Sequence, residues 1–425
     1  MKSKLSMLFG LLIIASMVLA ACGGGAPATE APPAVEEPAA TDAPATEAPA
    51  ATEDSATEAP AAETTTVTLW HSYHPDENEE KAFNQIVEAY EAQNPNVTID
   101  VLYVPFDQLE NKWSTEVAAG GGPDMFTMPN DNLGNWIRGG LVAPVDEYLA
   151  DHLDGFSDLA IQGVTYEDQM YAVPGIAKAV GLFYNKSLVE TPPTTTDELL
   201  AQVEEGKVLV MRPYAYFNYG LMTGSFGGAL LDESGKCVAD QGGFADAFAY
   251  MQELKDAGAI FEPDEGKANS MFSDGTAAFI VTGPWMLGTF KEALGDDLGV
   301  VPLPAGPGGE ATPLTGIDGW YLNPNSTNQQ AAIDFALYAF GPEGATIYAD
   351  VAGAPMGRTD IEISDPMIAG FADIANAGFP RPQSTEFGSW WGAFDDATTK
   401  VLEGQSEPEA AVTEACAAMN TANNK

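Results

Sequence analysis

The chain has few cysteines, few histidines and few basic residues. Three cysteines in 425 residues exclude a scaffold built on many disulfides. Three histidines leave few groups that exchange protons near neutral pH, although aspartate and glutamate could still serve an enzyme. Only 17 lysines and arginines accompany 62 aspartates and glutamates, a formal net charge of −45. This balance argues against nucleic acid as a partner and against a basic membrane-binding patch, because both depend on cationic side chains.

The sequence has enough apolar residues for a large folded body. Hydrophobic residues make up 45% of the chain and aromatic residues 10%, so its acidity does not imply disorder. A chain of 425 residues is too long for one core. We therefore expect two domains in addition to the termini.

The N-terminus predicts export and a lipid anchor. Lys2 and Lys4 precede an apolar run over residues 5–21, which is typical of a signal peptide. The run ends in Leu-Ala-Ala-Cys and resembles a bacterial lipoprotein signal, in which Cys22 becomes the lipid-bearing first residue of the mature chain. The alternative is an uncleaved transmembrane anchor of marginal length. In either case the rest of the protein lies outside the cytoplasm, held at the membrane.

Residues 22–65 are predicted to form a tether. The segment consists mainly of alanine, proline, threonine and glutamate, and Thr-Glu-Ala-Pro recurs at 29–32, 46–49 and 57–60. It lacks the residues of a core, and its nine acidic side chains repel one another. An extended chain of ~40 residues at ~3 Å each would reach up to ~120 Å.

From residue 66 onward the pattern is α/β. Strand-like segments at 66–70 and 97–104 flank a helical stripe, which predicts a parallel βαβ unit. A third strand is expected at 124–128, and strands and helices alternate again after residue 180. The stripe consists of Phe83, Ile86, Val87 and Tyr90. The predicted fold is two α/β lobes with a helical C-terminal third.

Aromatic residues gather in the predicted loops of this body. Ligands of open α/β sheets bind at the carboxyl ends of strands, and aromatic faces beside Asp, Asn and Ser suit sugar rings. For any single aromatic residue, a place in the core is an equally good interpretation. The clusters lie at 70–74, 214–219, 283–285 and 387–391. Together they favour a sugar site.

Short motifs follow one another in a specific order within a resemblance that covers about residues 66–420. They are LWHSY at 69–73, GPD at 122–124, YAVP at 171–174, FYNKSL at 183–188, FSDGTAA at 272–278 and TGPW at 282–285. In this order they resemble the extracellular solute-binding proteins of carbohydrate ABC importers, and the maltose/maltodextrin-binding branch in particular.

The resemblance implies a type II periplasmic-binding-protein fold, with two α/β lobes joined by a hinge. Lobe one would comprise 66–177 and 314–353, and lobe two 180–312 and 356–421. An oligosaccharide would bind in the cleft, and closure would present a surface to the permease subunits and their ATPase. The resemblance implies a monomer with no cofactor and no catalytic activity.

The resemblance also assigns ligand-binding residues. Asp131 would accept a sugar hydroxyl, and His71 and Ser72 would add polar contacts from the first-strand loop. The expected stacking residues are Tyr216, Trp285 and Trp391, and loop position adds Asp318 and Trp390. The chain departs from the branch at Met128, Asn132, Lys178 and Tyr214, which bears on the identity and length of the sugar.

Three other interpretations of the sequence carry less weight. His71 and His74 could suggest a metal pair, but their spacing fits no metal motif, so no metal site is expected. Adjacent acidic pairs could suggest a secreted glycoside hydrolase, yet such pairs are expected by chance among 62 acidic residues. A sugar sensor without transport would look almost the same in sequence.

Cys237 and Cys416 remain once Cys22 carries lipid. An even number of cysteines in an oxidising compartment allows a disulfide between the hairpin expected at 230–238 and the last helix. Two separate thiols are the alternative, and the sequence leaves both open.

Overall fold

The computed structural model describes residues 64–425. The predicted signal peptide, Cys22 and nearly all of the predicted tether therefore lie outside the described residues. Among the residues that are described, no helix is both long and apolar enough to span a membrane. Both sheets discussed below belong to one compact unit, Ala61–Lys425.

The first sheet begins with the predicted βαβ unit. Strands β1 (Thr65–His71) and β2 (Val97–Tyr103) pair in parallel along their whole length, which confirms the predicted pairing. Between them, helix α2 (Asn78–Gln93) buries Phe83, Ile86 and Tyr90 of the predicted stripe. The strand order is β13-β12-β3-β1-β2. Strand β6 lies off this path and pairs antiparallel with β12 between Gly316 and Tyr321. The other bounds are β3 Met125–Pro129, β6 Ala172–Lys178, β12 Leu314–Leu322 and β13 Phe379–Pro380.

The second sheet has the order β11-β7-β10-β8-β9. Strand β7 is antiparallel to both β10 and β11, whereas β8 is parallel to β10 and β9. Apolar side chains fill its central strands, so helices must cover both faces. The bounds are β7 Gly181–Asn185, β8 Leu209–Met211, β9 Ile260–Phe261, β10 Phe279–Thr282 and β11 Leu298–Val301.

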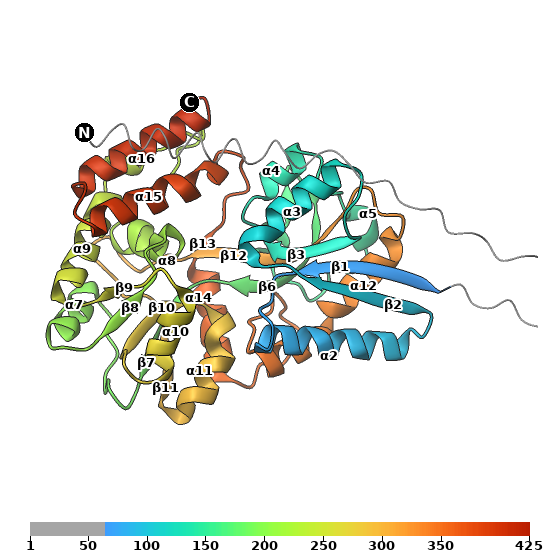
Figure 1. The fold of residues 1–425 in the computed structure, drawn as a ribbon, viewed down its shortest axis with the longest axis horizontal. Helices are drawn as coiled ribbons and strands as arrows, with labels where there is room; N and C mark the ends of the chain where they lie inside the picture. The colour runs from blue at the N-terminus through green and yellow to red at the C-terminus, as the bar shows by residue number, and fades with distance from the viewer. Residues whose placement is uncertain (1–63) are drawn as a thin grey trace, which may run out of the picture. The chain divides into compact units, whose positions relative to one another are not determined.

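The chain passes between the two sheets more than once. It leaves the first sheet after β6, enters the second at β7, and returns from β11 to β12. Figure 1 shows β6 and β12 running toward the second sheet between the two groups of helices. These connections form the hinge of a two-lobed α/β fold.

The C-terminal region is helical, as predicted. Helices α15 (Trp390–Leu402) and α16 (Pro408–Ala422) pack on each other beside α8 (Ala215–Gly220) and α9 (Phe244–Ala257) (Figure 1). A disulfide joins Cys237 to Cys416 on α16, with the two Cα atoms 5.3 Å apart. The expected hairpin at 230–238 is reduced to a single bridge between Leu231 and Cys237.

The remaining elements connect and cover these layers. They are α3 Phe106–Ala118, α4 Leu133–Arg138, α5 Asp146–Leu149, α6 Asp158–Gly163, β4 Thr165–Tyr166, β5 Gln169–Met170, α7 Thr196–Glu204, η1 Leu221–Ser225, η2 Ala239–Gln241, α10 Glu265–Ser273, η3 Pro284–Met286, α11 Leu287–Leu294, η4 Gly295–Asp297, α12 Gln329–Ala339, α13 Pro342–Ile347, η5 Tyr348–Ala352, α14 Pro366–Ala377 and η6 Phe387–Ser389.

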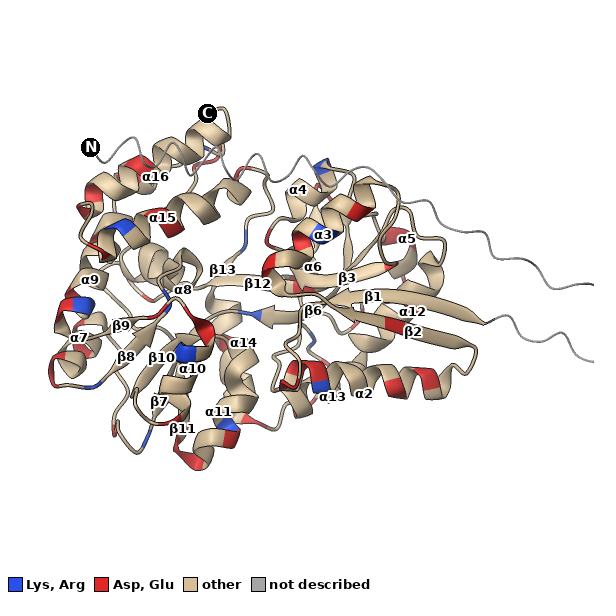
Figure 2. Ribbon diagram, in the orientation of Figure 1, with Lys and Arg blue, Asp and Glu red and all other residues tan. Residues whose placement is uncertain are grey.

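Acidic residues are spread over the outer helices. Figure 2 shows them on α2, α9, α11 and α16, among other elements. Two lysines and nine acidic residues precede Thr66, so the rest of the chain carries 15 basic and 53 acidic residues, a net charge of −38. The charge is therefore mainly a property of the folded body.

Candidate functional site

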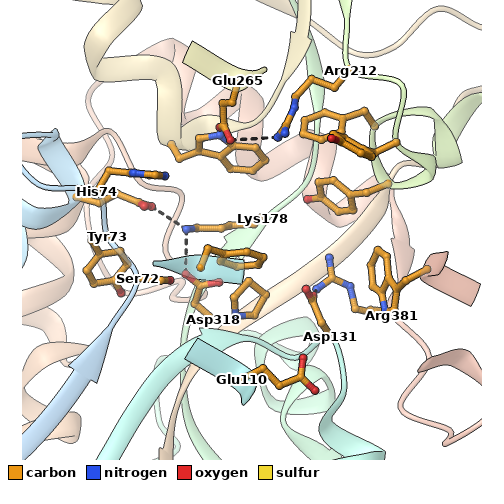
Figure 3. A pocket seen from close by; sticks show the side chains of 18 of the residues that line it. Ser72, Tyr73, His74, Glu110, Asp131, Lys178, Arg212, Glu265, Asp318 and Arg381 are labelled. Carbon is orange, nitrogen blue, oxygen red and sulfur yellow. Dashed lines mark hydrogen bonds and ion pairs between the residues drawn. The ribbon is translucent and has the colours of Figure 1, made fainter. Parts of the chain in front are cut away.

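A cavity of about 490 Å³ lies where loops of the two lobes face each other. Its volume is within the range of small-molecule sites, roughly 300–1,000 Å³. Side chains of both sheets and of the helical C-terminal region line it (Figure 3). Six of the eight ligand-binding residues predicted from the sequence lie here: Ser72, Asp131, Tyr216, Trp285, Asp318 and Trp391.

Three aromatic rings form one wall of this pocket. Tyr216 on α8 lies 6.4 Å from the ring of Trp285 on η3, with 30° between the planes. Its ring is also 6.4 Å from that of Trp391, near the start of α15. All three side chains are only partly buried, so their faces are available to a ligand. Such rings suit the apolar C–H face of a sugar.

Beside this wall, the carboxylate of Asp131 forms an ion pair with the guanidinium of Arg381. Asp131 follows β3 of the first sheet, and Arg381 directly follows β13. The guanidinium carbon lies 5.4 Å from the ring of Tyr216 and 5.6 Å from the ring of Trp391. Arg381 is 5% exposed. It therefore links the acceptor carboxylate to two of the aromatic rings.

The sequence analysis did not predict Arg381. Its signal was weak: one arginine between two prolines, shortly before the tryptophan pair, in a chain with only 17 basic residues. Only the pairing of β13 with β12 brings this segment to the pocket.

A second charged group forms the floor of the pocket. The ammonium of Lys178 lies 2.8 Å from a carboxylate oxygen of Glu79 and 2.9 Å from one of Asp318. Burial raises the pKa of Asp318 to about 6, while Lys178 lowers it and Glu79 raises it further. Figure 3 shows Lys178 and Asp318 joined by a dashed line.

Comparison with known proteins identifies the family. The sequence pattern of the bacterial extracellular solute-binding proteins matches residues 85–370, more than half of the chain. The chain belongs to this family of solute-binding proteins.

Several curated relatives of this solute-binding protein have names that specify an oligosaccharide, which is galactooligosaccharide in one case and maltotriose or maltodextrin in the two that follow. It is 30% identical to the maltotriose-binding protein of Pyrococcus abyssi over 355 residues, which cover 79% of this chain and 77% of the relative. It is 26% identical to a maltodextrin-binding protein of Bacillus subtilis over 307 residues, 65% of this chain and 71% of the relative.

Solved structures confirm the fold. The maltose/maltodextrin-binding domain of Bdellovibrio bacteriovorus bound to maltotriose superposes with a TM-score of 0.78 at 24% identity, covering 85% of this chain and all of that one. The maltotriose-binding protein of Thermus thermophilus gives 0.75 at 24% identity, with 84% and 100% coverage. The predicted two-lobed periplasmic-binding-protein fold is therefore correct.

In this solute-binding protein, His71 does not line the pocket. It is 2% exposed and packs against the rings of Tyr73, Phe83 and Tyr103. Its Nδ1 accepts a hydrogen bond of 3.2 Å from the Tyr73 backbone N–H. Burial lowers the pKa of His71 to about 4. The prediction that His71 contacts the sugar is corrected, because the end of β1 directs its ring into the core.

Trp390 is also a core residue rather than a pocket residue. It is fully buried and contacts the rings of Tyr219, Phe387 and Phe394. Neighbouring residues on an α-helix point about 100° apart, so α15 can direct only one of the two tryptophans into the pocket. That residue is Trp391.

Further charged side chains line the pocket. Arg212 pairs with Glu265 at 3.0 Å, and His74 and Glu77 are also in the lining. Burial raises the pKa of Glu77, His74 lowers it, and Glu265 raises it again. Within residues 64–425, no three His, Cys, Asp or Glu side chains are placed to hold a metal ion.

Of the four positions that depart from the maltodextrin-binding branch, one lies in the core and three lie in the pocket wall. Met128 is buried in β3. Asn132, Lys178 and Tyr214 line the pocket. The side-chain amide of Asn132 donates to both carboxylate oxygens of Glu110, at 3.0 and 2.9 Å. These departures therefore change the chemistry of the pocket wall and leave the fold intact.

Proposed function

We propose that this solute-binding protein captures a neutral maltooligosaccharide in the pocket and delivers it to an ABC importer. One observation carries the proposal: three neighbouring aromatic rings, on Tyr216, Trp285 and Trp391, line one cavity together with the carboxylates of Asp131 and Asp318. Rings that cover an apolar face, beside carboxylates that accept hydroxyl hydrogens, suit a glucan. The names of the two curated relatives support the same class of ligand.

The proposal assigns contacts to both lobes. Ser72 and Asp131 follow strands β1 and β3 of the first sheet, and Asp318 lies in β12. Tyr216 and Trp285 belong to helical segments beside the second sheet. A ligand drives closure only if it binds the closed form more tightly than the open form. Contacts from both lobes meet this requirement, since they are complete only after closure. We place the lobe boundaries at 66–177 with 314–353 and 180–312 with 356–421.

We further propose that the protein works as a binding protein and not as an enzyme. Three carboxylates of the pocket have cationic partners: Asp131 with Arg381, Asp318 with Lys178 and Glu265 with Arg212. The family to which the chain belongs consists of solute-binding proteins. Purified protein should therefore release no reducing sugar from starch.

The N-terminal features complete the proposal. Removal of residues 1–21 would leave Cys22 as a lipid-bearing N-terminus, and residues 22–65 would connect the body to the outer face of the membrane. A relative in Streptococcus pneumoniae, 23% identical over 379 residues, is named a solute-binding lipoprotein of a maltooligosaccharide ABC transporter. Labelling with a radioactive fatty acid, lost in Cys22→Ala, would support the anchor. Gel filtration of the unlipidated protein should give a monomer.

Calorimetric titration with maltotriose tests the sugar site. Trp285→Ala should weaken binding roughly tenfold to a hundredfold, because a stacked ring contributes about 1–3 kcal/mol. Tyr338→Ala is a matched control, since this aromatic residue lies on α12 and forms hydrogen bonds with Gln93 and Glu343 outside the pocket. Equal affinity of both variants would refute the site.

A thermal-shift panel of sugars tests the ligand class. A ligand that binds only the folded state raises the melting temperature. A shift with maltotriose and none with unrelated disaccharides is expected. A shift with another sugar alone would change the ligand and leave the binding function in place.

A further inference from the structure

Lys178 occupies a special position between the two lobes. It is the last residue of β6 and lies opposite Gly316 of β12, three residues before the chain enters β7. It is a basic residue at a position where the resemblance leads one to expect an acidic ligand-binding group. Its side chain is 11% exposed, yet it reaches the pocket. A buried lysine beside the pocket requires a physical explanation.

The contacts of Lys178 extend to both lobes. Its ammonium pairs with Glu79 on α2 at 2.8 Å and with Asp318 on β12 at 2.9 Å, and these side chains are 12% and 3% exposed. It also lies 5.9 Å from the ring of Trp285, which belongs to the other lobe. The two carboxylates satisfy the charge, while the ring is within cation–π distance.

We propose that Lys178 is a positioning residue of the sugar pocket, whose ion pair holds the Asp318 carboxylate in its charged form. The inference rests on the proposed function for its effect on sugar binding. Its effect on Asp318 can be measured without a ligand.

Three observations show why Asp318 needs a counter-charge. Asp318 is 2% exposed, and burial by itself favours its protonated form. Its Oδ1 has no hydrogen-bond donor among the residues described. Glu79 adds a second negative charge nearby, which favours protonation further. Lys178 is therefore the group that opposes protonation of Asp318.

The other groups around Asp318 cannot replace Lys178. Burial raises the pKa of all four tyrosines that interact with Asp318, so they remain neutral near pH 7. They are Tyr73 before α2, Tyr216 on α8, Tyr321 on β12 and Tyr348 on η5. Burial of the Lys178 ammonium would lower its own pKa, but Asp318 and Glu79 raise it above the ordinary lysine value. Lys178 thus remains charged over the pH range in which Asp318 titrates.

The ionised form of Asp318 is the useful one for sugar binding. A carboxylate accepts hydrogen bonds only, so it requires a hydroxyl donor from the ligand. Protonation removes the charge that strengthens such a bond. Lys178 therefore gives the pocket floor a preference for a sugar that presents a hydroxyl to Asp318.

The first test follows the Asp318 carboxyl by carbon-13 NMR over a pH range, in the ligand-free protein. Lys178→Gln should move its titration to higher pH by at least about one unit, because the counter-charge is lost. Lys178→Arg should leave it close to that of the wild type. An unchanged titration in Lys178→Gln would overturn the proposal.

A second variant, for which the Asp318 titration should move in the opposite direction, is used if Lys178→Gln does not fold. Glu79→Gln removes the like charge and should move the Asp318 titration to lower pH. A shift to higher pH, or none, would contradict the electrostatic account. Melting temperatures of all variants show which of them are folded.

The second test measures the affinity for maltotriose from pH 5 to 9. Lys178→Gln should bind roughly tenfold to a hundredfold more weakly at pH 7 and should recover as the pH rises and Asp318 ionises. Lys178→Arg should restore the wild-type profile. A loss in Lys178→Gln that is the same at every pH would show a merely structural role and refute the proposal. If wild type binds no sugar at any pH, the proposed function fails, and the carboxyl titration still decides the role of Lys178.

Discussion

Replacing Asp131 by asparagine should destabilise the protein, because it leaves the guanidinium of Arg381 without its counter-charge. The substitution keeps the shape of the side chain. Arg381 is 5% exposed, and its ion pair is with Asp131. Removing one partner of a buried pair costs roughly 3–5 kcal/mol. The Asp131 side chain is 20% exposed, so water can solvate part of the site, and two aromatic rings remain close to the guanidinium. We therefore expect a loss near the lower limit, about 3 kcal/mol.

The assay is the free energy of unfolding in urea for a four-member cycle. The members are wild type, Asp131→Asn, Arg381→Met and the double variant. Methionine retains an apolar side chain beside the rings and removes the charge. The double variant should be more stable than Asp131→Asn alone by about 1–2 kcal/mol, since no unpaired charge remains.

Two results would refute this reasoning. The first is an Asp131→Asn variant within about 0.5 kcal/mol of wild type, the level of an ordinary surface substitution. The second is a double variant less stable than Asp131→Asn alone, because the charge of Arg381 would then be satisfied by other groups. Asp131→Asn and the double variant should also bind maltotriose more weakly than wild type, which calorimetry at one pH can check.

Three further predictions concern the disulfide, the tryptophan pair and the buried histidine. Replacing Cys237 and Cys416 by alanine should lower the free energy of unfolding by up to about 5 kcal/mol, because the disulfide closes a loop between residues 179 apart. If wild type were equally stable with and without a reductant, this prediction would be wrong. Trp390→Ala should cost about 3–5 kcal/mol in urea unfolding. Trp391→Ala should instead weaken sugar binding with a smaller loss of stability. A larger loss of affinity in Trp390→Ala than in Trp391→Ala would contradict the assignment of Trp390 to the core and Trp391 to the pocket. The folded-state pKa of His71 is about 4 and its ordinary value 6.5, so between these pH values the unfolded chain binds a proton that the folded chain does not. Wild type should therefore lose roughly 3 kcal/mol more stability than His71→Gln as the pH falls through this range, and parallel curves would disprove it.

Much of the fold could be predicted from local patterns. The stripe containing Phe83, Ile86 and Tyr90 specified a helix, and the β-branched segments on either side specified a parallel pair. These signals are local, because side-chain periodicity follows from backbone geometry within a few residues. The order of the short motifs then specified the two-lobed fold.

The site was only partly predictable. The family resemblance and loop position identified six pocket residues, but His71 and Trp390 have side chains directed into the core. Neighbouring residues have similar sequence signals, and the direction of a side chain depends on how its element packs. The disulfide had the same limitation, since the distance between two cysteines 179 residues apart is set by the fold.

By itself, the sequence determined that the chain has a two-lobed α/β body, an acidic exterior and aromatic residues at the ends of strands. Only the tertiary structure decided which charges meet. Lys178 forms ion pairs with Glu79 and Asp318, and Arg381 forms one with Asp131. The partners are 99, 140 and 250 residues apart in the sequence. The physical reason is that ion pairs act over a few ångströms, a distance that strand pairing creates and that periodicity along the chain does not encode.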